Sequence, residues 1–117
     1  MNLNTMEALK AADVDWEGAL KRFSGNTELF ERFLRRFPED KTYEQLTQAL
    51  EAGNTEDAFA AAHTLKGVTA NLGIDSVLKV TAEMVELLRS KKLEEARGLS
   101  PELERRYERI CGILTQE

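Results

Sequence analysis

The sequence predicts an all-α fold, an antiparallel four-helix bundle with one or two short extra helices at its N-terminus. Ala, Leu, Glu, Lys and Arg dominate the composition, and the 117 residues include only two prolines. No run of alternating β-branched and polar residues is long enough to predict a strand. Four long segments with helical spacing, joined by loops of about two to eight residues, favour a bundle. We expect one domain over 1–117, with its core over about 13–116.

The first two elements are short helices, expected over about 5–12 and 15–23. Asn4 or Thr5 opens the first helix, and Asp15 opens the second. These residue types favour helix starts because their side-chain oxygens accept hydrogen bonds from the free amides of the first turn.

The first long segment covers about 27–52 and is opened by Asn26 or Thr27. Pro38 interrupts it, and a proline inside a helix removes a hydrogen bond and clashes with the preceding turn. We therefore expect a break or a kink near Phe37. The apolar residues before the proline recur at helical spacing and are expected in the core: Leu29, Phe30, Phe33, Leu34 and Phe37.

The second long helix is expected over about 56–72, between the caps Gly53 and Gly73, and Asn54 or Thr55 opens it. At about 100° per residue, its residues separate into two stripes. The core stripe holds Ala58, Ala61, Leu65, Val68 and Leu72. The opposite, solvent-facing stripe holds Phe59, His63, Lys66, Gly67 and Ala70.

The last two long helices are expected over about 76–91 and 101–116, with a single helical turn at 93–98 between them. Asp75 caps the first of them. Ser100-Pro101 predicts the start of the second, because proline is favoured in the first turn of a helix.

Composition and charge exclude several classes of function. The 16 Lys and Arg residues are outnumbered by 21 Asp and Glu residues, and this acidic balance argues against a nucleic-acid partner. No stretch approaches the roughly 18 apolar residues of a membrane-spanning helix, and no secretory signal opens the chain. We expect no membrane insertion and a cytoplasmic location. Cys111 is the only cysteine and His63 the only histidine, so an internal disulfide or a two-histidine zinc site is excluded.

His63 lies at the middle of the solvent-facing stripe, with Lys66 and Gly67 beside it at the next helical turn. Gly67 costs roughly 1 kcal/mol relative to alanine inside a helix, and the missing side chain gives access to the imidazole. Ala70, on the same stripe, has a small side chain that projects little from the helix surface. Phe59, one turn earlier, is expected either to join a docking surface or to tuck into the core.

The neighbours of His63 favour a group carrier over a hydrolase. A neutral imidazole is a nucleophile near physiological pH, and the Lys66 ammonium would pair with an anion bound to the ring. No carboxylate adjoins His63 on its own helix face, and no Ser or Cys lies at a spacing that it could activate. No GxxxxGK[ST] loop or kinase glycine loop is present, so the chain is not expected to be an enzyme.

The segment His63-Thr64-Leu65-Lys66-Gly67-Val68-Thr69-Ala70-Asn71-Leu72-Gly73 resembles the signature of histidine-containing phosphotransfer (HPt) domains of bacterial two-component relays. That signature has Leu, Lys and Gly at the second, third and fourth positions after the histidine, then a small residue and an apolar-Gly pair. The segment from Asp13 to Phe37 is also similar to the family's N-terminal part. The resemblance extends from about Val14 onward.

This resemblance implies that the exposed histidine accepts a phosphoryl group from a receiver-domain aspartyl-phosphate and passes it to another receiver. His63 would be the phosphorylation site, Lys66 the stabiliser of phosphoryl charge and Gly67 the clearance for the partner. The expected docking residues are Phe59, Ala70 and Asn71. The implied partners are response-regulator receiver domains, with a hybrid sensor histidine kinase as a further candidate. No cofactor of its own is implied, because the receiver supplies the magnesium ion.

Two other functions remain open from the sequence alone. One is a receiver-docking or helical interaction module that does not carry phosphate, and the other is a scaffold in which His63 is incidental. Arg32, Arg35 and Arg36 form either a solvated basic face or a contact for an acidic receiver surface. Glu83 and Glu86 are candidate polar neighbours of His63, but both are expected on the solvent side of their helix.

Overall fold

The structure, a computed structural model, describes all residues 1–117 and contains eight α-helices and one 3₁₀ turn. They are α1 (Leu3–Ala11), α2 (Trp16–Arg22), α3 (Thr27–Arg36), the 3₁₀ turn η1 (Phe37–Glu39), α4 (Thr42–Ala52), α5 (Thr55–Leu72), α6 (Asp75–Arg89), α7 (Leu93–Gly98) and α8 (Ser100–Thr115). No strand forms, and the only β-bridge joins Val14 to Ile74. The all-α prediction is confirmed.

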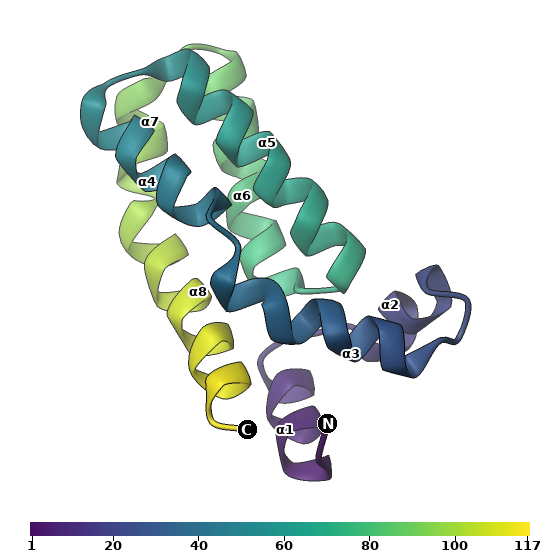
Figure 1. The fold of residues 1–117 in the computed structure, drawn as a ribbon. Coiled ribbons are helices and arrows are strands. Elements are labelled where there is room, and N and C mark those ends of the chain that lie inside the picture. The colour runs from purple at the N-terminus through teal and green to yellow at the C-terminus, as the bar shows by residue number, and fades with distance from the viewer.

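Four of these helices, α4, α5, α6 and α8, run alongside one another as the expected bundle (Figure 1). Tight turns reverse the chain between α4 and α5 and again between α5 and α6, so these neighbours are antiparallel. At one end of the bundle α7 connects α6 to α8. At the other end the short helices α1 and α2 and the crossing helix α3 surround the α5–α6 turn. None of the helices combines the length and the hydrophobicity that a membrane-spanning segment requires.

The expected interruption at Pro38 is a complete break. Residues Phe37–Glu39 form the 3₁₀ turn, and α3 leaves the direction of α4 to cross the end of the bundle (Figure 1). Because only one side of α3 is covered, Phe30 is fully buried while Phe33 is 43% exposed. The prediction that Phe33 belongs to the core is therefore wrong. Val68, predicted in the core stripe of α5, is likewise only half-buried.

Side-chain caps open four helices, and each accepts a hydrogen bond from the backbone amide three residues later. These caps are Asn2, Asp15, Asn26 and Asn54. The last three were predicted. The first helix begins earlier than predicted, because Asn2 takes the place of Asn4 or Thr5 at its cap.

Two other helices also begin one residue before the predicted position. Ile74, fully buried, occupies the cap of α6, so Asp75 lies in the first turn. Leu99 occupies the cap of α8, so Ser100 is already helical, because α7 and α8 follow one another almost without a loop. Neither start has a side-chain hydrogen bond to a free amide.

The segment between α1 and α2 fastens the α5–α6 turn to the rest of the protein. The Asp15 amide donates to the Gly73 carbonyl at 2.8 Å, and the Asp75 amide donates to the Asp13 carbonyl at 3.0 Å. Trp16 is buried beside this turn and meets Phe30 edge to face, with ring centroids 4.9 Å apart. These contacts fix the end of α5, the helix that carries His63.

Candidate functional site

Helix α5 is fixed at both ends by the local signals that the sequence predicted. Asn54 caps its start, accepting from the Asp57 amide at 3.0 Å, while the Asn54 side-chain amide donates to the Asp57 carboxylate at 2.8 Å. Gly73 ends the helix in the left-handed region, with φ of 71°. The Ile74 amide then returns to the Thr69 carbonyl at 2.9 Å. The 18 residues between these caps form an uninterrupted helix.

The inner face of α5 is closely packed against α4 and α6. Its buried residues are Ala58, Ala61, Ala62, Leu65, Thr69 and Leu72. Thr69 is the one buried polar side chain among them, and its hydroxyl donates to the Leu65 carbonyl at 2.9 Å. Its hydrogen bond offsets the cost of placing a hydroxyl in the core.

The outer face of α5 is open. His63, Gly67, Ala70 and Asn71 are exposed, and Lys66 is half-buried. The structure therefore brings the predicted phosphorylation site, charge stabiliser, clearance position and two docking residues onto one continuous surface. None of the chain's salt bridges involves His63 or Lys66, so the Lys66 ammonium is available to an external anion.

Phe59 lies beside the imidazole and is half-buried, in contact with the core, rather than an exposed aromatic. Its ring stacks against His63, with centroids 5.9 Å apart and planes inclined by 25°. Arg89, at the end of α6, holds its guanidinium carbon 5.0 Å from the Phe59 centroid. The Arg89 side chain also pairs with Glu86 at 3.4 Å. Phe59 thus supports one side of His63 and is itself covered by a cation.

Arg89 is the neighbour of this site that sequence reasoning missed. A helical wheel relates only residues of one helix, whereas Phe59 and Arg89 belong to α5 and α6. The predicted exposure of Glu83 and Glu86 is confirmed. The Glu86 carboxylate pairs with Arg89 on its own helix, and no hydrogen bond joins it to the imidazole of His63.

Gly67 has open space where a side chain would stand. A Cβ atom built there meets no other atom within 4 Å, and the backbone of Gly67 is not in the left-handed region. Neither packing nor backbone conformation therefore requires glycine at this position. The conformational cost of Gly67 is not offset by any contact inside the chain, and the gap beside His63 opens only to the outside.

The outer face as a whole presents an accessible imidazole, an unpaired ammonium and, at Gly67 and Ala70, residues whose side chains are absent or small. This combination suits the transfer of an anionic group to the ring by a partner that approaches α5 closely. No group of three or more His, Cys, Asp or Glu side chains that could hold a metal ion occurs in the structure.

The sequence matches the family model described as "Hpt domain" over residues 28–112. The chain belongs to the Hpt domain family. Searches of curated proteins and of solved structures found no significant match. Membership implies histidine phosphotransfer in two-component phosphorelays, and Hpt domains are phosphocarrier modules that interact with receiver domains and kinases.

The Hpt match begins in α3 and ends at Gly112 in α8, so it includes all of α4, α5 and α6, most of α8 and the outer face of α5. Helices α1 and α2 precede the match. The predicted resemblance from about Val14 to residue 27 is therefore outside the matched range. In this Hpt domain these residues nevertheless contact the site's helix, because Arg22 Nε donates to the Asn71 carbonyl at 3.2 Å.

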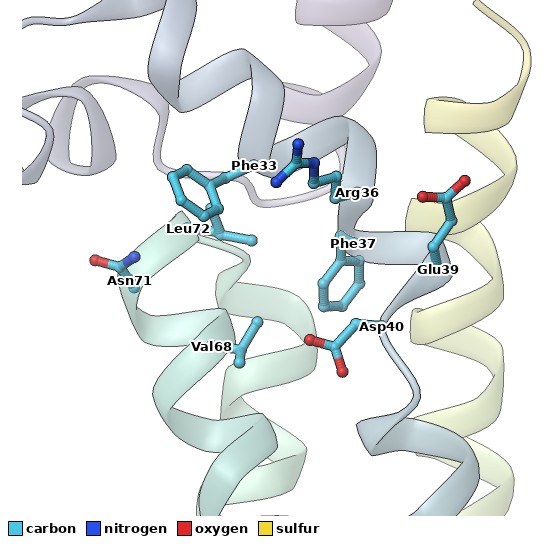
Figure 2. Close-up of a pocket in the computed structure, with 8 residues that line it drawn as sticks. All are labelled: Phe33, Arg36, Phe37, Glu39, Asp40, Val68, Asn71 and Leu72. Atoms are coloured by element: carbon cyan, nitrogen blue, oxygen red, sulfur yellow. The ribbon is translucent and has the colours of Figure 1, made fainter.

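A groove adjoins the outer face of α5 in this Hpt domain, with a volume of about 470 Å³. Figure 2 shows its two walls, one from α3 and the following 3₁₀ turn and the other from the C-terminal half of α5. Its lining residues are Phe33, Arg36, Phe37, Glu39, Asp40, Val68, Asn71 and Leu72. Val68 and Asn71 follow His63 by five and eight residues, so the groove begins on the same helix as the candidate site.

Proposed function

We propose that this Hpt domain is a phosphorelay intermediate. His63 accepts a phosphoryl group from the aspartyl-phosphate of a receiver domain and passes it to the aspartate of another receiver. The observation that carries the proposal is the position of His63 within the matched domain. Its imidazole is exposed at the middle of α5, beside a free ammonium and above an empty Gly67 position.

The transfer step is a displacement at phosphorus. The lone pair of the unprotonated ring nitrogen of His63 forms a bond to phosphorus, while the second ring nitrogen keeps its proton. The bond from phosphorus to the receiver's aspartate oxygen breaks, and the aspartate leaves as a carboxylate with the electron pair. In the reverse step a receiver carboxylate attacks phosphorus and the imidazole leaves. No other co-reactant is consumed.

The neighbours of His63 have separate roles in this proposal. Lys66 pairs with the phosphoryl oxygens while they are attached to the ring, because ionised donors make the stronger hydrogen bonds to anions. Gly67 lets the receiver's active site approach the ring. Phe59, Ala70 and Asn71 contribute to the surface on which the receiver docks.

The chain acts as a stoichiometric carrier rather than an enzyme. Its partners are response-regulator receiver domains and a hybrid sensor histidine kinase, and the proposed location is the cytoplasm. The magnesium ion that assists the receiver's aspartate is held by the receiver. A carrier of this kind needs only a nucleophile and access to it, which α5 provides.

The proposal is tested by a two-step relay with purified proteins. A receiver domain carrying ³²P from labelled acetyl phosphate is mixed with the chain, which is then separated and mixed with a second, unlabelled receiver. We expect acid-labile, base-stable label on the chain, its passage to the second receiver, and no label on His63→Gln. Label that persists on His63→Gln would refute the assignment. Binding of receivers without any transfer would favour a docking module that does not carry phosphate.

A further inference from the structure

The imidazole of His63 is not held by any hydrogen bond within the chain. Neither ring nitrogen takes part in a side-chain hydrogen bond, and no salt bridge reaches the ring. In a helix χ1 of a long side chain has about two common wells and χ2 of histidine about two more, so an unrestrained ring samples about four orientations. Only an orientation that aims a nitrogen lone pair at the partner's phosphorus can react. Whatever restrains the ring therefore affects the rate of transfer.

Phe59 is the side chain that packs against the imidazole. The Cα–Cβ bonds of a helix tilt toward its N-terminus, so His63 leans over the turn that carries Phe59, four residues earlier. The two ring centroids are 5.9 Å apart and the ring planes are inclined by 25°, which is the separation of an aromatic stack. On the C-terminal side of His63, Gly67 has no side chain that could press on the ring. The imidazole is therefore supported on the side of Phe59 and open on the side of Gly67.

Phe59 is itself fixed from two directions. Its half-buried ring packs against the hydrophobic core. From α6, the Arg89 guanidinium carbon lies 5.0 Å from the Phe59 centroid, within the range of a cation–π contact. Arg89 is in turn paired with Glu86, at 3.4 Å. A ring held by the core and by a second helix supports its neighbour more firmly than a freely exposed side chain would.

We infer that Phe59 is a positioning residue for phosphoryl transfer at His63. Its ring restricts the imidazole to one orientation and so raises the fraction of time in which a ring nitrogen can attack. A phenyl ring gives this support without a hydrogen bond, so one nitrogen stays free to attack and the other keeps its proton. The inference rests on the proposed function and adds to the docking role of Phe59 an effect that is present before any receiver binds.

Two measurements on Phe59→Leu test the inference, because leucine keeps an apolar side chain against the core but has no flat ring to stack on the imidazole. The first is the order parameter of the His63 ring, from ¹³C relaxation of the free chain labelled with ¹³C-histidine, in which His63 is the only histidine. We expect a rigid ring in wild type and an order parameter below about 0.6 in Phe59→Leu.

The second measurement is the initial rate of transfer against the concentration of a purified receiver domain charged with acetyl phosphate. In Phe59→Leu we expect the saturating rate to fall about fourfold, as one ring orientation becomes about four, and the half-saturating concentration to stay within about twofold. A loss of docking alone would raise the half-saturating concentration instead.

Two further variants serve as controls, with circular dichroism to show that each has the wild-type helix content. Phe59→Tyr keeps the stacked ring and should retain both the ring order and the saturating rate. Phe23→Leu is the matched control, because Phe23 is also half-buried but its ring contacts Phe30 and Phe33 rather than His63. It should leave the ring order and the saturating rate unchanged.

An unchanged saturating rate in Phe59→Leu would overturn the inference, whether or not the half-saturating concentration rises. A lowered rate with an unchanged ring order parameter would also contradict it, because the effect would then not act through the imidazole. Failure of wild type to become labelled by any receiver would instead refute the proposed function, whereas the ring order parameter of the free chain would still report the contact with Phe59.

Discussion

Helix α5 contains one glycine, Gly67, and a second, Gly73, caps its C-terminal end, but the fold requires only one of the two. Gly73 has φ of 71°, and a Cβ atom there would stand 2.6 Å from the Asp15 carbonyl oxygen and 3.0 Å from the Ala19 Cβ. Gly67 has ordinary helical geometry, and a Cβ atom there would meet nothing within 4 Å. The glycine at position 73 is explained by contacts inside the chain. Gly67, which lies beside His63, is explained only by a partner that approaches from outside.

The same division separates the two faces of α5. The inner face, with residues such as Leu65 and Thr69, is fully packed and has its polar group hydrogen-bonded. On the outer face, the side chains of His63 and Lys66 form no ion pair within the chain. Changes on the inner side should therefore alter stability, whereas changes on the outer side should alter transfer.

The largest effect is expected for Gly73→Ala. An L-residue in the left-handed region costs roughly 1–2 kcal/mol, and relieving the overlap with Asp15 costs a further 1–3 kcal/mol, so a loss of about 3 kcal/mol in the free energy of unfolding is expected. Urea denaturation measures this quantity. A loss below about 1 kcal/mol would mean that the α5–α6 turn relaxes easily, contrary to the close contact with Asp15.

Gly67→Gln should lower the rate of transfer and leave stability unchanged. Its side chain would project beside His63 and obstruct the receiver, so transfer is expected to fall about 100-fold, comparable to the loss of an essential approach geometry. The urea midpoint should stay near that of wild type, because the added atoms meet nothing in the chain. Transfer at the wild-type rate would show that Gly67 provides no clearance.

Lys66→Ala should reduce phosphoryl stabilisation without closing the site. A charge-assisted hydrogen bond contributes about 1.5 kcal/mol at the low end, so the transfer rate or the phosphohistidine lifetime should fall roughly tenfold. Lys66→Arg is the matched control and should retain most of both quantities, since it keeps the positive charge. If Lys66→Ala changes neither rate nor lifetime, Lys66 has no part in the mechanism.

The smallest effect is expected for Gly67→Ala on stability, and its sign is informative. Alanine is favoured over glycine inside a helix by roughly 0.5–1 kcal/mol, so the variant should be more stable than wild type by about that amount. Thermal or urea unfolding, run beside Gly73→Ala, gives a direct comparison of the same substitution at two sites. A destabilised Gly67→Ala would reveal an internal packing role that the structure does not contain.

The sequence predicted what depends on local periodicity and caps. The helices of the bundle, the break before Pro38, the end of α5 at Gly73 and the exposure of His63 all follow from signals within one segment, and the structure contains each of them. These features require no knowledge of how helices cross.

The features that were missed depend on how separate helices meet. Phe33 and Val68 have the spacing of core residues, but α3 crosses the end of the bundle and leaves a groove between them. Arg89 reaches Phe59 from a different helix, so no pattern within α5 indicates it. Ile74 is the N-cap of α6, and its amide donates to the Thr69 carbonyl in the turn that ends α5. This hydrogen bond joins the two helices at Gly73, which a pattern within α6 does not indicate.

The most direct test of the central claim uses the fact that His63 is the only histidine in the chain. In chain labelled with ¹⁵N-histidine, the imidazole spectrum therefore contains a single ring. On addition of a phosphorylated receiver, the account predicts that one ring nitrogen shifts and couples to ³¹P, and that both changes disappear when an unphosphorylated receiver is added in excess. The account would be contradicted if the imidazole spectrum stayed unchanged while the chain took up the receiver's phosphate, or if the phosphate were found on any residue other than His63.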